Sequence, residues 1–386
     1  MILDDWQNGG FGLYLHWPFC QSKCPYCDFN SHVAATIDQN RWKRAYLAEI
    51  DRMADETPDR ILQSVFFGGG TPSLMDPDLV AAILDRIRAK WPQTNDWEVT
   101  LEANPGSVEA GRFRGYADAG VTRISMGIQA LNDGDLRKLG RMHSVAEAKA
   151  AFDVARQAFD RVSFDLIYAR QDQTLANWGA ELREALSMAV DHLSLYQLTI
   201  EDGTAFGDRF AKGGLKGLPD EDLSAEMYDL TQDVCDAAGL PAYEVSNHAA
   251  PGFESRHNLI YWRGGDYLGI GPGAHGRLTL NGVRWATEAP GAPGAWLTKV
   301  ESGAAGEQPR DAVPGGERAL EYLMMGLRLS EGIDLGRYER LAGSAININK
   351  INGLSDIGMV DRAGNRLVAT AKGRLVLNAV IRELAA

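Results

Sequence analysis

The stretch Gly12 to Asn30, GLYLHWPFCQSKCPYCDFN, decides the fold and indicates the chemistry. It opens with a β-rich run at Gly12 to His16 and continues into a loop that holds Cys20, Cys24 and Cys27. In parallel α/β folds the loops that follow the carboxyl ends of the strands carry the functional residues. Three soft thiolate ligands in one such loop suit an iron–sulfur cluster or zinc.

Five more β-rich runs follow, and helical patterns separate them, which predicts repeated βα units. Because six units fall short of the eight in a closed barrel, we expect an α/β fold with an incomplete (βα)6, TIM-like barrel. The predicted strands are Gly12 to His16, Ser64 to Phe67, Glu98 to Leu101, Arg123 to Gly127, Val162 to Ile167 and His192 to Leu198. The predicted helices are Asp38 to Asp55, Asp78 to Lys90, Ala110 to Ala119, Val145 to Ala158, Leu175 to Met188 and Leu223 to Ala238.

The βα rhythm ends near residue 240, and we expect three regions. A barrel core spans 1–240, a segment with a linker spans 241–300, and a C-terminal domain spans 301–386. The Gly/Pro/Ala-rich stretch from Ala289 to Gly316 predicts a linker or domain boundary. A small helical, winged-helix-like cap is indicated by helices at Glu317 to Leu329 and Leu335 to Ala342, a hairpin at Met359 to Thr370 and a last helix from Ala371.

The composition is that of an ordinary globular protein, with 45% hydrophobic and 24% charged residues among 386. The formal net charge of −13 does not favour nucleic-acid binding, which depends on clustered cations. The acidic first residues lack the basic start of a signal peptide. No stretch approaches the roughly 18 apolar residues of a membrane helix. We therefore expect a cytoplasmic protein with no nucleic-acid partner.

Two metal sites fit the three clustered cysteines. A structural zinc ion would need a fourth ligand, which His16 or His32 could supply. A catalytic [4Fe-4S] cluster would instead use the three thiolates and leave one iron open. Cys235 lies far away on a predicted helix, and we expect it to be a buried structural thiol.

The spacing Cys-x3-Cys-x2-Cys, with Tyr26 before the last cysteine, resembles the defining motif of the radical S-adenosylmethionine (radical SAM) superfamily. Nearly the whole chain resembles its oxygen-independent coproporphyrinogen III oxidase-like family. The resemblance implies a [4Fe-4S] cluster on Cys20, Cys24 and Cys27, with S-adenosylmethionine bound at the open iron. One electron from the cluster would then cleave the sulfonium to give a 5′-deoxyadenosyl radical.

The same resemblance implies a cofactor site at the ends of successive strands. The segment GGGTP at 68–72 matches the family's contact with the methionine end of the cofactor, and Glu102 matches a cofactor ligand. Each match alone would read as an ordinary turn or surface residue, but their joint order along the strands is specific. The implied residues for S-adenosylmethionine are Tyr14, Tyr26, Gly69, Gly70, Thr71, Glu102, Gln129, Arg141 and Asp165. No catalytic residue is assigned.

The stretch Gly271 to Gly276, GPGAHG, satisfies the G-x-G-x-x-G pattern of dinucleotide-binding folds. That pattern requires a helix to open at the last glycine. Because Arg277 to Gly282 predicts a strand and a turn instead, we exclude a dinucleotide site.

Two features depart from the oxidases of this family. They carry a further cysteine two residues after the third, where this chain has Phe29, and a longer segment than the 19 residues that precede Cys20. The segments CDFNSH at 27–32 and RHNLIYW at 256–262 resemble instead the haem (heme) chaperone subgroup, HemW, whose HNxxYW motif is implicated in haem binding. The haem-binding candidates that this implies are His257, Asn258, Tyr261 and Trp262.

Adjacency in sequence suggests Arg256 and Arg263 as partners of the haem propionates. The structural alternative is that His257 and Asn258 hold a loop while Tyr261 and Trp262 fill the core. The competing candidates for a haem ligand are His16, His32, His143, His192, His248 and His275, of which His192 lies inside a predicted strand and suits a core role.

The resemblance implies a haem chaperone that binds haem and transfers it to apo-haemoproteins, with respiratory enzymes at the inner membrane surface as acceptors. The alternative is an oxygen-independent coproporphyrinogen III oxidase, which decarboxylates propionates oxidatively through the radical. A third reading is methyl transfer or haem ring opening on the same scaffold. Whether the protein is an enzyme, and whether it forms a homodimer, stay open at this point.

Overall fold

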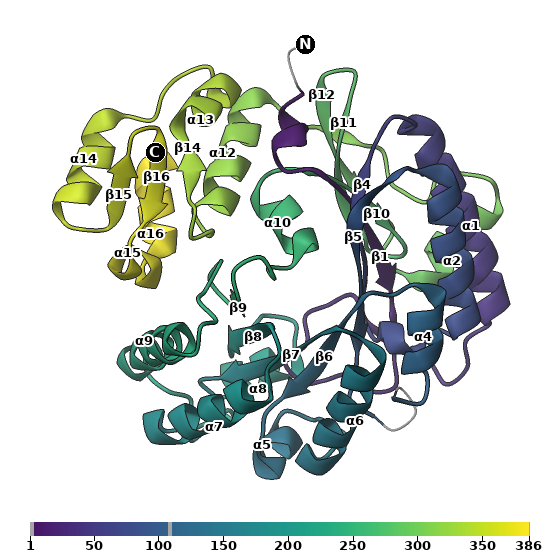
Figure 1. The fold of residues 1–386 in the computed structure, drawn as a ribbon, viewed down its shortest axis with the longest axis horizontal. Coiled ribbons are helices and arrows are strands. Elements are labelled where there is room, and N and C mark those ends of the chain that lie inside the picture. The colour runs from purple at the N-terminus through teal and green to yellow at the C-terminus, as the bar shows by residue number, and fades with distance from the viewer. Residues whose placement is uncertain (1–3, 107–109, 386) are drawn as a thin grey trace.

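A computed structural model describes residues 4–106 and 110–385 and confirms the α/β incomplete barrel. Six parallel strands form its centre, and each predicted strand is present (Figure 1). They are β1 (Phe11–Trp17), β4 (Leu62–Gly69), β5 (Gln93–Ala103), β6 (Arg123–Gln129), β7 (Arg161–Tyr168) and β8 (His192–Gln197).

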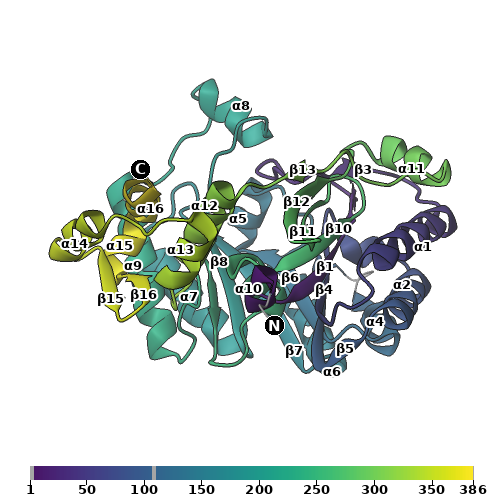
Figure 2. The same cartoon turned by 90° about the horizontal axis from the view of Figure 1, so that it is seen from above.

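Six helices pack on the outer face of these strands (Figure 1). They are α1 (Gln39–Glu56), α2 (Pro77–Lys90), α4 (Phe113–Ala119), α6 (Val145–Ala158), α7 (Leu175–Met188) and α9 (Glu221–Ala237). Two shorter helices, α5 (Asp133–Lys138) and α8 (Ala205–Ala211), lie in loops between them, and α8 projects away from the barrel in Figure 2. None of the helices in the described part of the chain is both long and apolar enough to cross a bilayer.

The two faces of the sheet differ in polarity because side chains alternate along each strand. On β4, Val65 and Phe67 are fully buried in the main hydrophobic core beneath the helices. Ser64 on the same strand, Thr100 on β5 and Ser163 on β7 are buried polar residues. Their hydroxyls lie toward the inner face, so the barrel has a polar interior that can hold polar or charged ligands.

The sheet extends beyond the six predicted strands. β10 (Asp266–Ile270) pairs in parallel with the other side of β1, so a seventh parallel strand lies in the segment where the βα rhythm is lost. Three antiparallel strands continue that edge, and β9 (Asn247–Ala249) closes the other edge. The three are β11 (His275–Leu280), β12 (Val283–Glu288) and β13 (Asp311–Ala312).

The prediction of a linker from Ala289 to Gly316 is wrong for its first half. This segment contains α11 (Pro293–Glu301), which packs on α1. Trp296 is fully buried there and stacks on Trp42, with ring centroids 5.6 Å apart and planes 3° from parallel. One large aromatic side chain therefore anchors a stretch whose glycines and prolines suggested a linker or domain boundary.

The C-terminal region has its own apolar core, formed by residues between Tyr322 and Leu384. It contains a three-stranded antiparallel sheet and lies beside α10 (Arg256–Trp262) in Figure 1. Its helices are α12 (Gly315–Gly326), α13 (Leu335–Ala342), α14 (Ile348–Asp356), α15 (Ala371–Leu375) and α16 (Leu377–Ala385), and its strands are β14 (Ile333–Asp334), β15 (Val360–Ala363) and β16 (Arg366–Ala369). The expected hairpin of a winged-helix-like cap is present, and the last helix expected from Ala371 is divided into α15 and α16 at Val376.

Candidate functional site

The cysteine loop follows β1 and is closed by a short parallel pairing of β2 (Phe19–Cys20) with β3 (His32–Val33). Asn30 fixes the loop to the turn between β10 and β11. Its side-chain amide donates hydrogen bonds to the carbonyl oxygens of Pro272, at 3.0 Å, and of Gly291, at 2.8 Å. The cysteine loop is therefore held by residues that lie in the chain after the six predicted βα units.

This contact explains why the GPGAHG stretch needs its glycines. Gly273 has φ +75°, and a Cβ there would lie 2.3 Å from Nδ2 of Asn30. Only glycine lets the backbone approach the cysteine loop so closely in this conformation. The chain continues from this turn into β11, which agrees with the exclusion of a dinucleotide site.

His16 is occupied by hydrogen bonds that hold the same loop. Its Nε2 donates to the carbonyl oxygen of Asn30 at 2.9 Å, so its Nδ1 accepts from the hydroxyl of Tyr14 at 3.0 Å. His32 contacts Oδ1 of Asn30 through its Nε2 at 3.1 Å. Because both ring nitrogens of His16 already have partners, the structure does not favour it as a fourth zinc ligand.

Each of the three clustered thiols has a hydrogen-bonding neighbour. Thr71 Oγ1 donates to Cys20 Sγ at 3.4 Å, and Arg141 Nη1 donates to Cys24 Sγ at 3.4 Å. Cys27 Sγ lies 3.9 Å from the hydroxyl of Ser31. Hydrogen bonds of this kind stabilise thiolates bound to iron and tune an iron–sulfur cluster.

The arrangement of the thiols suits a cluster. All three cysteines line one cavity beside the barrel mouth. Within residues 4–106 and 110–385, no three His, Cys, Asp or Glu side chains lie close enough together to hold one metal ion. A [4Fe-4S] cluster places a different iron on each thiolate and needs a wider opening than a single zinc ion. The thiol donor set therefore fits the cluster better than zinc.

Eight of the nine residues implied for S-adenosylmethionine line this same cavity. They are Tyr26, Gly69, Gly70, Thr71, Glu102, Gln129, Arg141 and Asp165. The ninth, Tyr14, does not line it and lies deeper in the barrel, where its ring stacks on Phe66 at a centroid distance of 6.2 Å. Residues from four strands and three loops thus converge on one space next to the thiols.

Arg141 connects the cysteine loop to two strand ends. Its Nη2 donates to Oδ1 of Asn104 at 2.7 Å and to the carbonyl oxygen of Gly127 at 2.8 Å, while its Nη1 reaches Cys24. The amide of Asn104 in turn donates to Thr71 Oγ1 at 3.2 Å. One guanidinium therefore sets the spacing between the cluster loop and the cavity floor.

Two carboxyl groups face this cavity from the inner face of the sheet. Burial and then the nearby charge of Asp165 together raise the pKa of Glu102 to about 8, against the opposing effects of the Gly69 amide and Arg123. Burial also raises the pKa of Asp165 to about 6, although Ser194 and Arg123 act in the opposite direction. Both groups would ionise more readily beside a cation, such as a sulfonium or an amino group.

Two further residues contribute to the cavity. Asn104 and Ser125 both line the cavity, although neither was assigned a role. Ser125 shares the inward face of β6 with Gly127 and Gln129. A polar residue at every second position of an otherwise apolar strand is the signal that could have identified it.

The segment implied for haem binding forms α10, which packs against β1, β4 and β10. His257 is 1% exposed. Its Nδ1 lies 2.8 Å from Ser64 Oγ, and its Nε2 lies 2.5 Å from the hydroxyl of Tyr261. Burial lowers its pKa to about 3. In this conformation His257 is a hydrogen-bonded core residue, and an iron could bind it only after one of these partners moves.

The other residues near this segment are also engaged. Asn258 donates to the hydroxyl of Tyr243 at 3.2 Å, and His192 Nε2 lies 3.1 Å from the same hydroxyl inside the core. Arg256 pairs with Asp96, and Arg263 pairs with Glu331 at 2.8 Å. Because both arginines already pair with carboxylates of the protein, the structure does not favour them as partners of the haem propionates. Cys235 is fully buried, as expected.

Two family profiles match the sequence. The Radical SAM superfamily matches residues 14–183, which hold the cysteine loop and the strands through β7. The HemN C-terminal domain matches residues 313–376.

Curated relatives match over most of the chain. The heme chaperone HemW of Haemophilus influenzae is 38% identical over 381 residues, covering 96% of each chain. HemW of Escherichia coli is 43% identical over 69% of this chain and 70% of its own. The mitochondrial radical S-adenosyl methionine domain-containing protein 1 of Mus musculus is 41% identical over 83% of this chain and 74% of its own.

Among solved structures, coproporphyrinogen III oxidase (HemN) from Escherichia coli has the same fold. It superimposes with a TM-score of 0.82 and covers 98% of this chain and 90% of its own. The two sequences are 20% identical, so the likeness concerns the fold alone.

Proposed function

Because the chain belongs to the HemW family of the radical SAM superfamily, we propose that it is a haem chaperone, which binds haem and passes it to apo-haemoproteins. The observation that carries the proposal is that a relative named as a heme chaperone matches along 96% of the chain, through α10 and the C-terminal region. The resemblance read from CDFNSH and HNxxYW agrees with it.

The cluster and its cofactor belong to the same proposal. We propose that Cys20, Cys24 and Cys27 ligate a [4Fe-4S] cluster and that the adjoining cavity binds S-adenosylmethionine. When bound, the cluster supplies one electron to the sulfonium of the cofactor. The polar groups of this chain fix the arrangement: Arg141 and Thr71 hold two of the thiolates, and Glu102 offers a carboxylate to the amino group or ribose hydroxyls.

The position of Phe29 favours the chaperone over the oxidase. It occupies the place where the oxidases of the family have a further cysteine, and its side chain is 58% exposed at the edge of the cavity. This chain therefore lacks the further thiol of the oxidases at this position.

The test uses the full chain with its cluster reconstituted anaerobically. One sample receives haem, and a second receives coproporphyrinogen III, S-adenosylmethionine and a reductant. The proposal predicts a stoichiometric Soret band in the first sample and no catalytic formation of protoporphyrinogen in the second. Catalytic protoporphyrinogen formation would establish the oxidase instead, and absence of any Soret shift would refute haem binding.

A further inference from the structure

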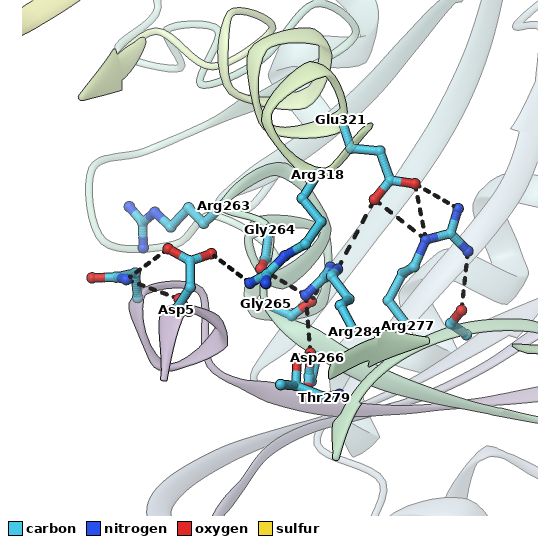
Figure 3. Close-up of polar contacts among 12 residues, drawn as sticks. Asp5, Arg263, Gly264, Gly265, Asp266, Arg277, Thr279, Arg284, Arg318 and Glu321 are labelled. Atoms are coloured by element: carbon cyan, nitrogen blue, oxygen red, sulfur yellow. Dashed lines mark hydrogen bonds and ion pairs between the residues drawn. The ribbon is translucent and has the colours of Figure 1, made fainter. Parts of the chain in front are cut away.

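A second cavity lies between the barrel and the C-terminal region, away from the cysteine loop. Its walls come from η1 (Asp5–Asn8), the end of α10, strands β10 to β12, and helices α12 and α13. Figure 3 shows this junction, where side chains from η1, β11, β12 and α12 converge on the backbone of the glycine turn at 264–265. The cavity has a free volume of about 200 Å³.

The charge of this cavity differs from that of the whole chain. Arginines 277, 284, 318 and 337 line it, together with two carboxylates, Asp5 and Glu321. Four positive and two negative charges leave an excess of two positive charges, in a chain whose net charge is −13. The nearby pair of Arg60 and Asp266, with an N–O distance of 3.1 Å, leaves this balance unchanged. Such a local excess favours a ligand with two negative charges.

Three of the four arginines are fixed by partners in the protein. Arg277 pairs with Glu321 at 2.8 Å, and Arg284 pairs with the buried carboxylate of Asp266 at 3.0 Å. Arg337 binds both carboxylate oxygens of Asp5, at 2.8 and 2.9 Å. These groups form a rigid frame of positive charge.

Arg318 differs from the other three. Its nearest carboxylate oxygen, on Asp5, is 3.8 Å away and already bound by Arg337. Its Nε is buried, and no described residue accepts a hydrogen bond from it. Figure 3 shows its guanidinium between Asp5 and Arg284. Burial lowers the pKa of Arg284, and the positive charge of Arg318 adds to that effect. The carboxylate nearest to Arg318 is thus shared with Arg337, and a bound carboxylate would give Arg318 a closer anion beside the positive charge of Arg284.

The rest of the lining is aromatic and apolar. Tyr261, from the HNxxYW segment, meets Tyr267 edge to face with ring centroids 4.3 Å apart. Tyr322, Met324 and Met325 on α12 also line the cavity, and Met324 is 45% exposed at its outer side. Arginines next to aromatic rings and a flexible methionine suit a flat apolar ligand with acidic groups on one edge.

We propose that this cavity receives the propionate edge of haem, with Arg318 as the carboxylate-binding residue and the Tyr261–Tyr267 pair against the macrocycle. The inference rests on the proposed function and adds a site to it. The cavity is smaller than a whole porphyrin, so the remainder of the ring lies over Met324 toward solvent. The site is next to α10 but does not need His257 to leave its buried position.

The test compares haem with haem dimethyl ester, whose propionates are blocked, in one detergent-containing buffer. The full chain, Arg318→Met, Arg318→Lys and the control Arg362→Met, an exposed residue of β15, are titrated by the Soret band. We expect wild type and the control to bind the ester at least tenfold more weakly than haem. Arg318→Met should bind haem about tenfold more weakly, as loss of a charged hydrogen bond implies. For Arg318→Met, the affinity for the ester should be less than twofold weaker than its affinity for haem. Arg318→Lys should have a haem affinity between those of Arg318→Met and wild type.

Equal affinity of wild type for haem and its ester would overturn this site and leave the chaperone function intact. So would equal haem affinity of wild type and Arg318→Met. If wild type binds neither ligand, the proposed function fails and this site with it. The comparison of the two ligands on wild type does not depend on the folding of any variant.

Discussion

The hydroxyl oxygen of Ser64 and Nδ1 of His257 lie 2.8 Å apart, although 193 residues separate them in the chain. Through this contact β4 holds α10 inside the barrel, because the other ring nitrogen of His257 contacts Tyr261 on the same helix. The histidine of the HNxxYW segment therefore has a structural role in this conformation, whatever it does when haem is present.

Loss of this contact should destabilise the protein. Ser64→Ala leaves a buried ring nitrogen without a partner, which costs about 1–3 kcal/mol of unfolding free energy. Urea denaturation followed by circular dichroism measures it. Ser302→Ala, which removes an exposed hydroxyl bonded to Lys299, serves as the control and should cost less than about 0.5 kcal/mol. Equal effects of the two substitutions would contradict the structural role.

The four cysteines should separate into two classes. Replacing Cys20, Cys24 or Cys27 by serine should abolish the brown absorbance after anaerobic reconstitution and lower the iron content to background. Cys235→Ser should retain both, because this thiol is fully buried away from the loop and burial raises its pKa to about 12. Iron retained at the wild-type level in all three loop variants would rule out the cluster assignment.

Gly69 should be intolerant of a side chain. It has φ +112°, and a Cβ would lie 2.6 Å from the ring of His16. Gly69→Ala therefore strains the backbone and disturbs the amide that donates to Glu102 at 3.2 Å. Gly303→Ala is the matched control, since Gly303 also has positive φ but open space around it. We expect Gly69→Ala to lower the midpoint of thermal unfolding clearly more than Gly303→Ala. A similar decrease for both would show that the close approach of residue 69 to the ring of His16 does not affect stability.

The ligand-free protein should lose stability as the pH rises through the weakly acidic to neutral range. Folding raises the pKa of Glu102 from 4.5 to about 8, so between these values the folded state holds a proton that the unfolded state has released. This residue then lowers the unfolding free energy by up to about 1.4 kcal/mol per pH unit. Urea titrations from pH 4.5 to 8 should show a smaller decline for Glu102→Gln. If the unfolding free energies of wild type and Glu102→Gln changed with pH in the same way, Glu102 would not be protonated in the folded protein.

Local patterns were enough to predict the barrel, whereas the residues of the cavity beside it were implied by the resemblance to the radical SAM superfamily. Each βα unit carries its own alternation and helical period, and the motif residues stand at strand ends that meet at one edge of a parallel sheet. Eight of the nine residues that the resemblance implies for S-adenosylmethionine line one cavity, because strand ends of a parallel sheet meet at one edge.

Features that depend on distant contacts could not be predicted in this way. β10 is a five-residue run, DYLGI, with an Asp and a Gly, and its pairing with β1 and β11 makes it a strand. Trp296 turns a Gly/Pro-rich stretch into a packed helix because Trp42 provides a surface for its ring. One of the two hydrogen bonds of the buried His257 ring comes from Ser64, and nothing in the sequence indicates that these two residues are neighbours.

The most direct test of the account is haem transfer. The reconstituted chain is loaded with haem, freed of excess ligand and mixed with an apo-haemoprotein that binds haem without a covalent bond. We expect the Soret band of the acceptor to develop faster than with the same amount of free haem, while that of the chain is lost in equal amount. Retention of haem by the chain, or an acceptor rate no faster than that with free haem, would contradict it.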